Sequence, residues 1–387
     1  FGFNCMAIDL RVGDEVNGVK NETAARAKAK KMNPVFTDAE QDILFEEVYP
    51  FFGSLDIRDS SKKRSKAIER DLVYNLDLAL DVLQKGHEGL SFDILGELIT
   101  DVEKCKDKIN TSFSSGDEAS IAAFIGKEIN PVIAHLDEQF PQLTASTQYY
   151  QEVCAESGIC TQYRHAYEEA LSLINRSMIN CLDQEERDLQ RLYPCYFEKF
   201  RTDGVEYSIY AGPSIAQGSH LDPLYLDNLR LRQLLWTCSM MKQVKELQPV
   251  LQRLFAKAPS AKSGTNGADT QGTELDIAPL ILAYMTPITL KFRLDEKKLD
   301  VEGSQNVRFE ILKKRIDKAV ISGTQERLTQ PGFISIVFTQ DQESTAYEKH
   351  LQYLVKKDLI EPDWEKVELE AMQGVEGLRA IRVRLKG

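Results

Sequence analysis

The sequence predicts an α+β fold in which a mostly helical bundle is followed by a small C-terminal α/β sandwich domain. Apolar residues recur at helical spacing through much of residues 35–256, which indicates amphipathic helices. Strand-like and helix-like segments alternate over residues 275–387. These last residues include 18 basic and 18 acidic side chains, so residues 1–274 hold the whole net charge of −12. That shift supports a domain boundary near residue 275.

Composition narrows the class of protein. The chain has 387 residues, of which 42% are hydrophobic and 28% charged, as in globular chains of two or three domains. It contains no run of 18 apolar residues, so no membrane insertion is predicted. The acidic balance disfavours nucleic acid as a partner. The seven cysteines lack zinc-site spacing and are interpreted as free thiols of a cytoplasmic protein, with no metal or cofactor predicted.

The N-terminal part begins with a predicted strand, Phe1–Leu10, and a linker that extends to residue 34. Because the chain opens on Phe1 without a targeting signal, it is interpreted as a piece of a longer protein. Thr37 followed by Glu40 is a capping-box pattern, so a helix is predicted to begin there.

A long helix is predicted from residue 60 to Gly86. It carries an apolar stripe that consists of Ile68, Leu72, Leu76, Leu80 and Leu83. The stripe has two interpretations: it pairs two copies of the chain in a homodimer, or it packs against the helices predicted at 91–110 and 161–191. Further helices are predicted at residues 117–138, 143–156 and 221–255.

Three segments interrupt or follow the helices. Residues 192–217 contain an Asp-Gly turn and an alternating stretch, which predict a short hairpin. Residues 257–274 lack large apolar side chains and are predicted to be a flexible linker. The α/β domain is then predicted over 275–387, with strands at 275–284, 288–294, 333–338 and 378–385 and helices at 306–320 and 344–357.

Five separated segments carry a family resemblance: VYPFFGSLDIRDSSKKRSKAI, YFEKFRTDGVEYSIYAGPSIA, LYLDNLRLRQLLW, ITLKFRLDEKKLDVEGSQNVRFEILKKRIDKA and ERLTQPGFISIVF. They closely resemble the C-terminal part of large Bacteroidetes proteins described as GAF domain-containing. The resemblance implies an upstream small-molecule sensor of the GAF type, whose last strand would be Phe1–Leu10. It implies little about chemistry, because no activity is established for the family. The chain departs from the family in lacking most of the GAF domain and in its longer loop at 256–273.

The hairpin region is the leading candidate for a ligand site because six aromatic residues fall within 18 positions there. The candidate ligand-binding residues are Tyr196, Arg201, Tyr207, Tyr210 and His220. In one interpretation they line a pocket in which Arg201 pairs with an acidic ligand group. In the other, the aromatic rings pack the junction between helices and hairpin. His220 and Asp222 suggest an acid–base pair, although Asp222 before Pro223 is also a typical helix start.

Two further motifs allow a chemical and a structural interpretation. Asp56 and Asp59 resemble the metal-binding carboxylates of nucleotide cyclases, yet they directly precede a helix, where acidic residues act as caps. The basic run formed by Lys313, Lys314, Arg315 and Lys318 is either a solvated helix face or a docking surface for an acidic partner. No catalytic residue is predicted.

The leading hypothesis is therefore a non-enzymatic signalling or interaction module that acts downstream of a GAF-type sensor. Its expected partners are a second copy of the chain and a small-molecule ligand or a signalling protein. Two alternatives stay open at this point. One is an enzyme that acts on a nucleotide or another phosphorylated metabolite, and the other is a structural assembly subunit.

Overall fold

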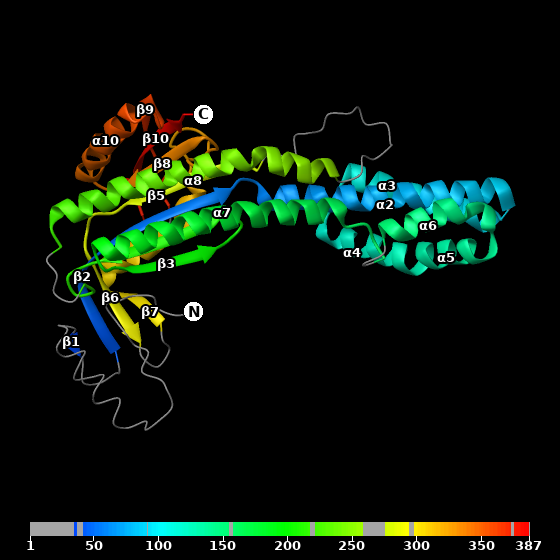
Figure 1. The fold of residues 1–387 in the computed structure, drawn as a ribbon, viewed down its shortest axis with the longest axis horizontal. Coiled ribbons are helices and arrows are strands. Elements are labelled where there is room, and N and C mark those ends of the chain that lie inside the picture. Colours follow the sequence, from blue (N-terminus) through cyan, green and yellow to red (C-terminus); the bar gives the residue numbers. More distant parts are fainter. Residues whose placement is uncertain are drawn as a thin grey trace, which may run out of the picture. The chain divides into compact units, whose positions relative to one another are not determined.

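The computed structural model describes residues 35–36, 42–90, 92–154, 158–216, 221–257, 275–293, 298–372 and 375–386 (Figure 1). The fold class is α+β, as predicted. The chain divides into two compact units. Unit 1 comprises the chain up to Arg58, Ile174–Glu246 and the part from Asp276 onward, and unit 2 comprises Asp59–Leu173 and Leu247–Leu275. The predicted strand Phe1–Leu10 and, except for Lys257, the predicted linker 257–274 lie outside the described residues.

Unit 1 is built on a sheet with the strand order β3-β4-β2-β5-β8-β10-β9. The β5–β8 pair is parallel and the other neighbours in this order are antiparallel. The strands are β2 (Asp42–Ile57), β3 (Tyr196–Arg201), β4 (Val205–Ala211), β5 (Ile277–Ala283), β8 (Phe333–Phe338), β9 (Ile360–Glu368) and β10 (Arg379–Leu385). The first part of β2 also pairs with β1 (Val35–Phe36) and β6 (Ile288–Arg293), and β6 pairs with β7 (Lys298–Glu302).

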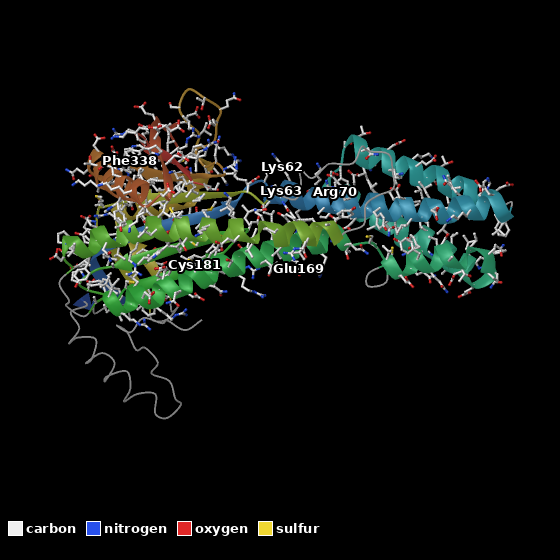
Figure 2. All side chains as sticks on the ribbon, turned by 45° about the horizontal axis from the view of Figure 1, so that its top comes forward. Lys62, Lys63, Arg70, Glu169, Cys181 and Phe338 are labelled. Carbon is white, nitrogen blue, oxygen red and sulfur yellow. The ribbon has the colours of Figure 1, made fainter. Side chains whose placement is uncertain are left out.

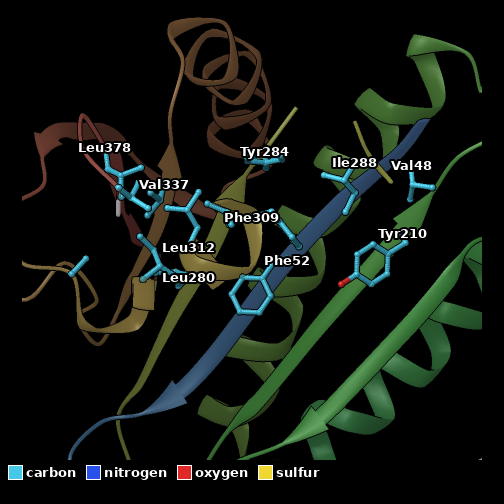
Figure 3. Packing of buried hydrophobic residues seen from close by; sticks show 14 of the residues in the cluster. Val48, Phe52, Tyr210, Leu280, Tyr284, Ile288, Phe309, Leu312, Val337 and Leu378 are labelled. Carbon is cyan, nitrogen blue, oxygen red and sulfur yellow. The ribbon is translucent and has the colours of Figure 1, made fainter. Parts of the chain in front are cut away.

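The two faces of this sheet carry separate apolar cores because side chains alternate along each strand. On β5, Leu280 and Leu282 belong to the core that contains Phe309 and Leu312 of α9 (Ser304–Arg315), as Figure 3 shows in part. We call this side the α9 face. On the opposite side, the α8 face, Ile281 packs with residues of α8 (Pro223–Lys257) and α10 (Asp341–Lys356). Every residue of β5 is buried, as expected for a central strand.

Residues 42–57 form a strand, whereas the capping-box pattern at Thr37 predicted a helix. Phe51 pairs with Ile209 of β4, and Phe52 pairs both with Ser208 of β4 and with Leu282 of β5. A local capping signal therefore yields to pairing with two strands distant in the sequence. The strand bends at a bulge between Phe45 and Val48, where Glu47 has φ 54°.

The predicted domain boundary at residues 257–274 does not separate two folding units. Strand β2 lies before the boundary and β5 after it, yet the two pair from Phe52–Leu282 to Ile57–Ile277. The hairpin β3–β4, assigned by sequence to the helical bundle, joins the same sheet through β2. Because β5 is buried on both faces, it requires a neighbour on each side, and β2 supplies one of them.

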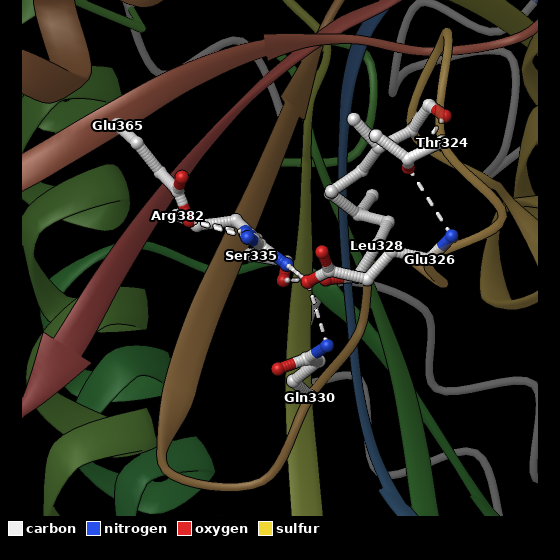
Figure 4. A network of polar contacts seen from close by, with 8 residues as sticks. Thr324, Glu326, Leu328, Gln330, Ser335, Glu365 and Arg382 are labelled. Atoms are coloured by element: carbon white, nitrogen blue, oxygen red, sulfur yellow. Dashed lines mark hydrogen bonds and ion pairs between the residues drawn. The ribbon is translucent and has the colours of Figure 1, made fainter.

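An ion-pair network connects β10 with its surroundings on unit 1 (Figure 4). The Arg382 guanidinium donates to Glu365 of β9 at 2.6 Å from Nε and to Glu326 at 2.5 Å from Nη1. The Arg382 side chain is only 9% exposed, so both carboxylates offset its desolvation. Neither β9 nor β7 was predicted from the sequence.

Unit 2 is a helical bundle made of α2 (Ser60–Leu90), α3 (Asp93–Thr111), α4 (Ser115–Phe124), α5 (Asn130–Gln139), α6 (Thr144–Val153), the start of α7 (Gln162–Leu192) and the end of α8. A π-helical turn, Ile125–Ile129, lies between α4 and α5. The basic side chains Lys62, Lys63 and Arg70 lie in the first three turns of α2 (Figure 2). None of the helices in the described ranges combines the length and the apolar composition needed to cross a membrane.

The apolar stripe of α2 is the core of unit 2. Leu72, Leu76, Leu80 and Leu83 are buried in one cluster with residues of α3, α4, α5 and α6. The stripe therefore packs internally and on α3, as one interpretation predicted, but α4, α5 and α6 cover it where α7 was expected. These side chains are not available as a dimer seam.

Candidate functional site

The alternation of β3 and β4 places the predicted site residues on opposite faces of the sheet. Tyr196 and Tyr210 lie on the α9 face, where their rings stack at 6.0 Å between centroids. Tyr207 lies on the α8 face, stacked on Phe197 at 6.1 Å and edge-on to Trp236 at 6.4 Å. Tyr207 and Tyr210 are both buried, and burial raises the pKa of each phenol. Their rings pack the junction between hairpin and helices.

Of the other two predicted ligand residues, the structure describes only Arg201. Arg201 is the last residue of β3 and is exposed. His220 lies outside the described residues. Asp222 acts as a helix start, since its Oδ1 accepts the Leu224 N–H at 3.0 Å and its carbonyl oxygen accepts the Tyr225 N–H at 2.9 Å.

A set of half-buried carboxylates lies on the α9 face, around the same hairpin. Phe52 belongs to the α9-face core, so strand alternation places Asp56 of β2 on that face too. Glu206 lies four positions from Tyr210 on β4, and Glu198 lies two positions from Tyr196 on β3. Both therefore lie on the α9 face, like these two tyrosines. We call Asp56, Glu198 and Glu206 the carboxylate face. Sequence analysis had considered Asp56 only as a helix cap or metal ligand.

Gly204 holds the hairpin turn against β2, next to Asp56. A Cβ atom at this position would lie 1.8 Å from the Leu55 carbonyl oxygen, so only glycine allows this approach. The Asp-Gly turn therefore has a tertiary role in addition to closing the hairpin.

The carboxylate face concentrates negative charge in a partly desolvated place. Burial raises the pKa of Asp56, and repulsion from Asp317 and Asp203 adds to the shift against the attraction of Arg58. Burial also raises the pKa of Glu206; Lys313 opposes that shift, while Asp317 and Asp56 add to it. The ionised form of these groups is therefore disfavoured.

Glu198 follows the same pattern. Burial raises its pKa, with an opposing attraction from Lys313 and an added repulsion from Glu310. Its carboxylate accepts a hydrogen bond from the Tyr196 hydroxyl at 3.0 Å. The aromatic pair on this face is thereby connected to the carboxylates.

The cations near this face make no direct contact with the carboxylates. Lys313 of α9 has its Nζ over two rings, at 5.8 Å from the centroid of Phe52 and 5.7 Å from that of Phe200. Within the described ranges, Lys313, Asp56 and Glu206 make no ion pair with one another or with other residues. Arg58 Nη1 and the Ser208 hydroxyl are buried without a hydrogen-bond partner. Carboxylates, cations and a hydroxyl group thus lie near one another without forming ion pairs or hydrogen bonds among themselves.

Asp59, the second carboxylate of the cyclase-like motif, belongs to unit 2. Its carbonyl oxygen accepts the Lys63 N–H at 2.9 Å and its carboxylate pairs with Lys62 at 3.1 Å. These contacts fit the capping interpretation. In the part of the chain that the structure describes, no group of three or more His, Cys, Asp or Glu side chains is arranged to hold a metal ion.

Unit 2 contains a buried polar network that sequence analysis missed. Asp71 is 1% exposed and accepts the N–H groups of Tyr163 at 2.8 Å and Arg164 at 2.9 Å, at the start of α7. Asn75, one turn further along α2, donates to Cys154 Sγ at 2.8 Å. Burial raises the pKa of Cys154 to about 11 and that of Cys160 to about 12, so both thiols are protonated at neutral pH. The detectable signal was the pair of polar residues, Asp71 and Asn75, beside the apolar stripe.

Replacing Glu206 by Gln, or Asp56 by Asn, is expected to raise the free energy of unfolding at pH 7 by about 0.5–2 kcal/mol. Both carboxyls have raised pKa values in the folded protein, so the folded state holds their protons more tightly. Stability therefore falls as pH rises from the ordinary carboxyl pKa of about 4 towards the raised value. Urea unfolding at pH 5 and pH 8 measures this difference, which each variant should reduce.

The control for this prediction is Asp363→Asn, which neutralises an exposed carboxylate of β9. It should leave the pH dependence unchanged. A loss of stability in Glu206→Gln at pH 7 would contradict the assignment, because it would mean that the ionised form stabilises the fold.

Comparisons with protein-family models, with curated proteins and with solved structures gave no significant match to this chain. The resemblance to GAF domain-containing proteins therefore stays a prediction. The functional argument rests on the geometry and charge of the described residues.

Proposed function

We propose that the chain is a non-enzymatic signalling or interaction module whose carboxylate face receives a positively charged group of a ligand or partner. One observation carries this proposal: three partly buried carboxylates, Asp56, Glu198 and Glu206, share one face of the sheet, and burial raises the pKa of each. Burial of ionised carboxylates, together with repulsion from neighbouring carboxylates, lowers the stability of the fold. Perturbed carboxylates of this kind cluster at functional sites. A bound positive charge would relieve the repulsion.

The wider role follows from the family resemblance. In this proposal a GAF-type sensor precedes the chain, and the chain passes its state to a partner in the cytoplasm. A homodimer stays part of the proposal, but the buried stripe of α2 cannot form its seam. Any self-association would have to use another surface.

A charged probe tests the proposed function. We expect tetralysine to bind the wild-type chain in a calorimetric titration, with an affinity that falls between 50 and 300 mM salt, as expected for a charge-driven contact. The double variant Asp56→Asn, Glu206→Gln should bind at least about tenfold more weakly. Asp363→Asn serves as the control and should bind like the wild type.

Two outcomes would contradict this proposal. Equal binding by the double variant would show that the probe uses another surface. Conversion of a nucleoside triphosphate in the presence of Mn²⁺, lost in Asp56→Asn, would favour the rival function of an enzyme that acts on nucleotides.

A further inference from the structure

We infer that the carboxylate face binds a small organic polyamine and that the Lys313 ammonium group competes with this ligand for the same place. The inference rests on the proposed function and adds to it the chemical class of the ligand. The place in question, which we call the ammonium site, is formed by the rings of Phe52 and Phe200 and by the nearby carboxylates.

The chain itself shows that this site accommodates an alkylammonium group. The Lys313 Nζ lies within 6 Å of the centroids of both rings. Such contacts attract organic cations through the negative faces of the rings. A metal ion prefers oxygen ligands and gains little from aromatic walls, so the site favours an organic cation.

The ammonium site has hydrogen-bonding capacity that Lys313 leaves unused. Lys313 makes neither a hydrogen bond nor an ion pair with a described residue, although its ammonium group has three donors. The Ser208 hydroxyl is fully buried and has no partner. It lies on the same strand face as Glu206, since the two residues are two positions apart on β4. This hydroxyl is a second polar group on the face, besides the carboxylates, that no described residue satisfies.

The charge of the face favours a ligand with more than one ammonium group. The three carboxylates of this face outnumber the two nearby cations, Lys313 and Arg58. Asp56 lies four residues beyond Phe52 on β2, about 13 Å along an extended strand. A polyamine could place one ammonium group between the rings and another close to Asp56. A single amine could not.

The ligand can reach this site from solvent. Phe200 lies on the edge strand β3 and is 47% exposed. Lys313 is itself partly exposed, so its flexible side chain can leave the rings without moving α9. Because Lys313 is tethered next to the site, it lowers the apparent affinity of any free amine.

Removal of the tethered competitor tests this inference. Lys313→Met keeps a long apolar side chain but removes the ammonium group. We expect this variant to bind spermidine at least about tenfold more tightly than the wild type in a calorimetric titration. Addition of Glu206→Gln should abolish the gain. Lys314→Met, at the exposed neighbouring position on α9, is the matched control and should behave like the wild type.

A second measurement uses the wild-type chain and does not depend on a variant that folds. Displacement of Lys313 by saturating spermidine should increase its rate of acylation, measured by mass spectrometry, while the rate for Lys314 stays constant. An unchanged rate for Lys313 would overturn the inference, as would a folded Lys313→Met variant that binds spermidine no more tightly than the wild type.

These results separate the inference from the proposed function. If tetralysine binds through Glu206 but Lys313→Met brings no gain, the proposed function stands and the competition by Lys313 is wrong. If neither tetralysine nor spermidine binds to any of these chains, both are wrong.

Discussion

Replacing Leu76 by Asp is expected to unfold unit 2. The Leu76 side chain is fully buried in the core of the bundle. Loss of a buried leucine costs about 2–5 kcal/mol, and a carboxylate left unpaired in its place costs several more. Together these approach the whole stability of a typical domain, about 5–15 kcal/mol. Circular dichroism should show loss of helix, and urea unfolding should show loss of the cooperative transition of the bundle.

The matched control is Gln84→Asp, an exposed position on the same helix. It introduces the same charge and should change the free energy of unfolding little. Leu80→Asp should act in the same direction as Leu76→Asp, since Leu80 is 8% exposed. The core assignment would be contradicted if the wild type were a dimer and the double variant Leu76→Asp, Leu80→Asp were a folded monomer. That result would show that the stripe is an interface.

Replacing Glu343 by Ala is expected to lower the free energy of unfolding of unit 1 by about 3 kcal/mol or more. This fully buried carboxylate accepts the Met285 N–H at 2.9 Å on Oε1. On Oε2 it accepts the N–H groups of Thr339 at 2.7 Å and Gln340 at 3.1 Å. Alanine would leave three backbone donors without a partner between the end of β5 and the start of α10. Urea unfolding measures the loss.

Glu343→Gln keeps one carbonyl oxygen and should lose less stability than alanine. Gln342→Ala changes the exposed neighbour in the same helical turn and should have little effect. If alanine at position 343 were as stable as the wild type, the link between Met285 and α10 would not contribute to the stability of unit 1.

Helices could be predicted wherever the signal was local. The stripe from Ile68 to Leu83 has the period of an amphipathic helix, and α2 follows it. The same period fits an internal core and a dimer seam equally well, so the partner of the stripe could not be predicted. Strand β2 shows the opposite case. Its pairing partners, β4 and β5, lie about 150 and 230 residues away in the chain, and the nearby capping signal was misleading.

The site could be predicted only by its location. The Asp-Gly turn at Gly204 and the alternation of β4 placed a hairpin correctly, and the structure confirms that hairpin. The carboxylate face was missed because its three members come from β2, β3 and β4, and the nearby Lys313 comes from α9. A usable signal was that the polar residues Glu206 and Ser208 lie two positions apart, and so on the same face, in an otherwise apolar strand. No such signal connects Lys313 to them, since only the sheet register and the packing of α9 bring these residues together.

The segments of unit 1 are separated in the sequence by those of unit 2, which has a consequence for synthesis on the ribosome. The described members of the buried cluster around α2 all precede Arg164, so this cluster can form while the rest of the chain is still being made. Strand β2 precedes the bundle, but its neighbour β5 begins only at Ile277. Throughout that interval one long edge of β2 lies open, and unpaired edges promote aggregation. The bulge at Glu47 and the charged ends of β2 would protect the nascent chain during this delay.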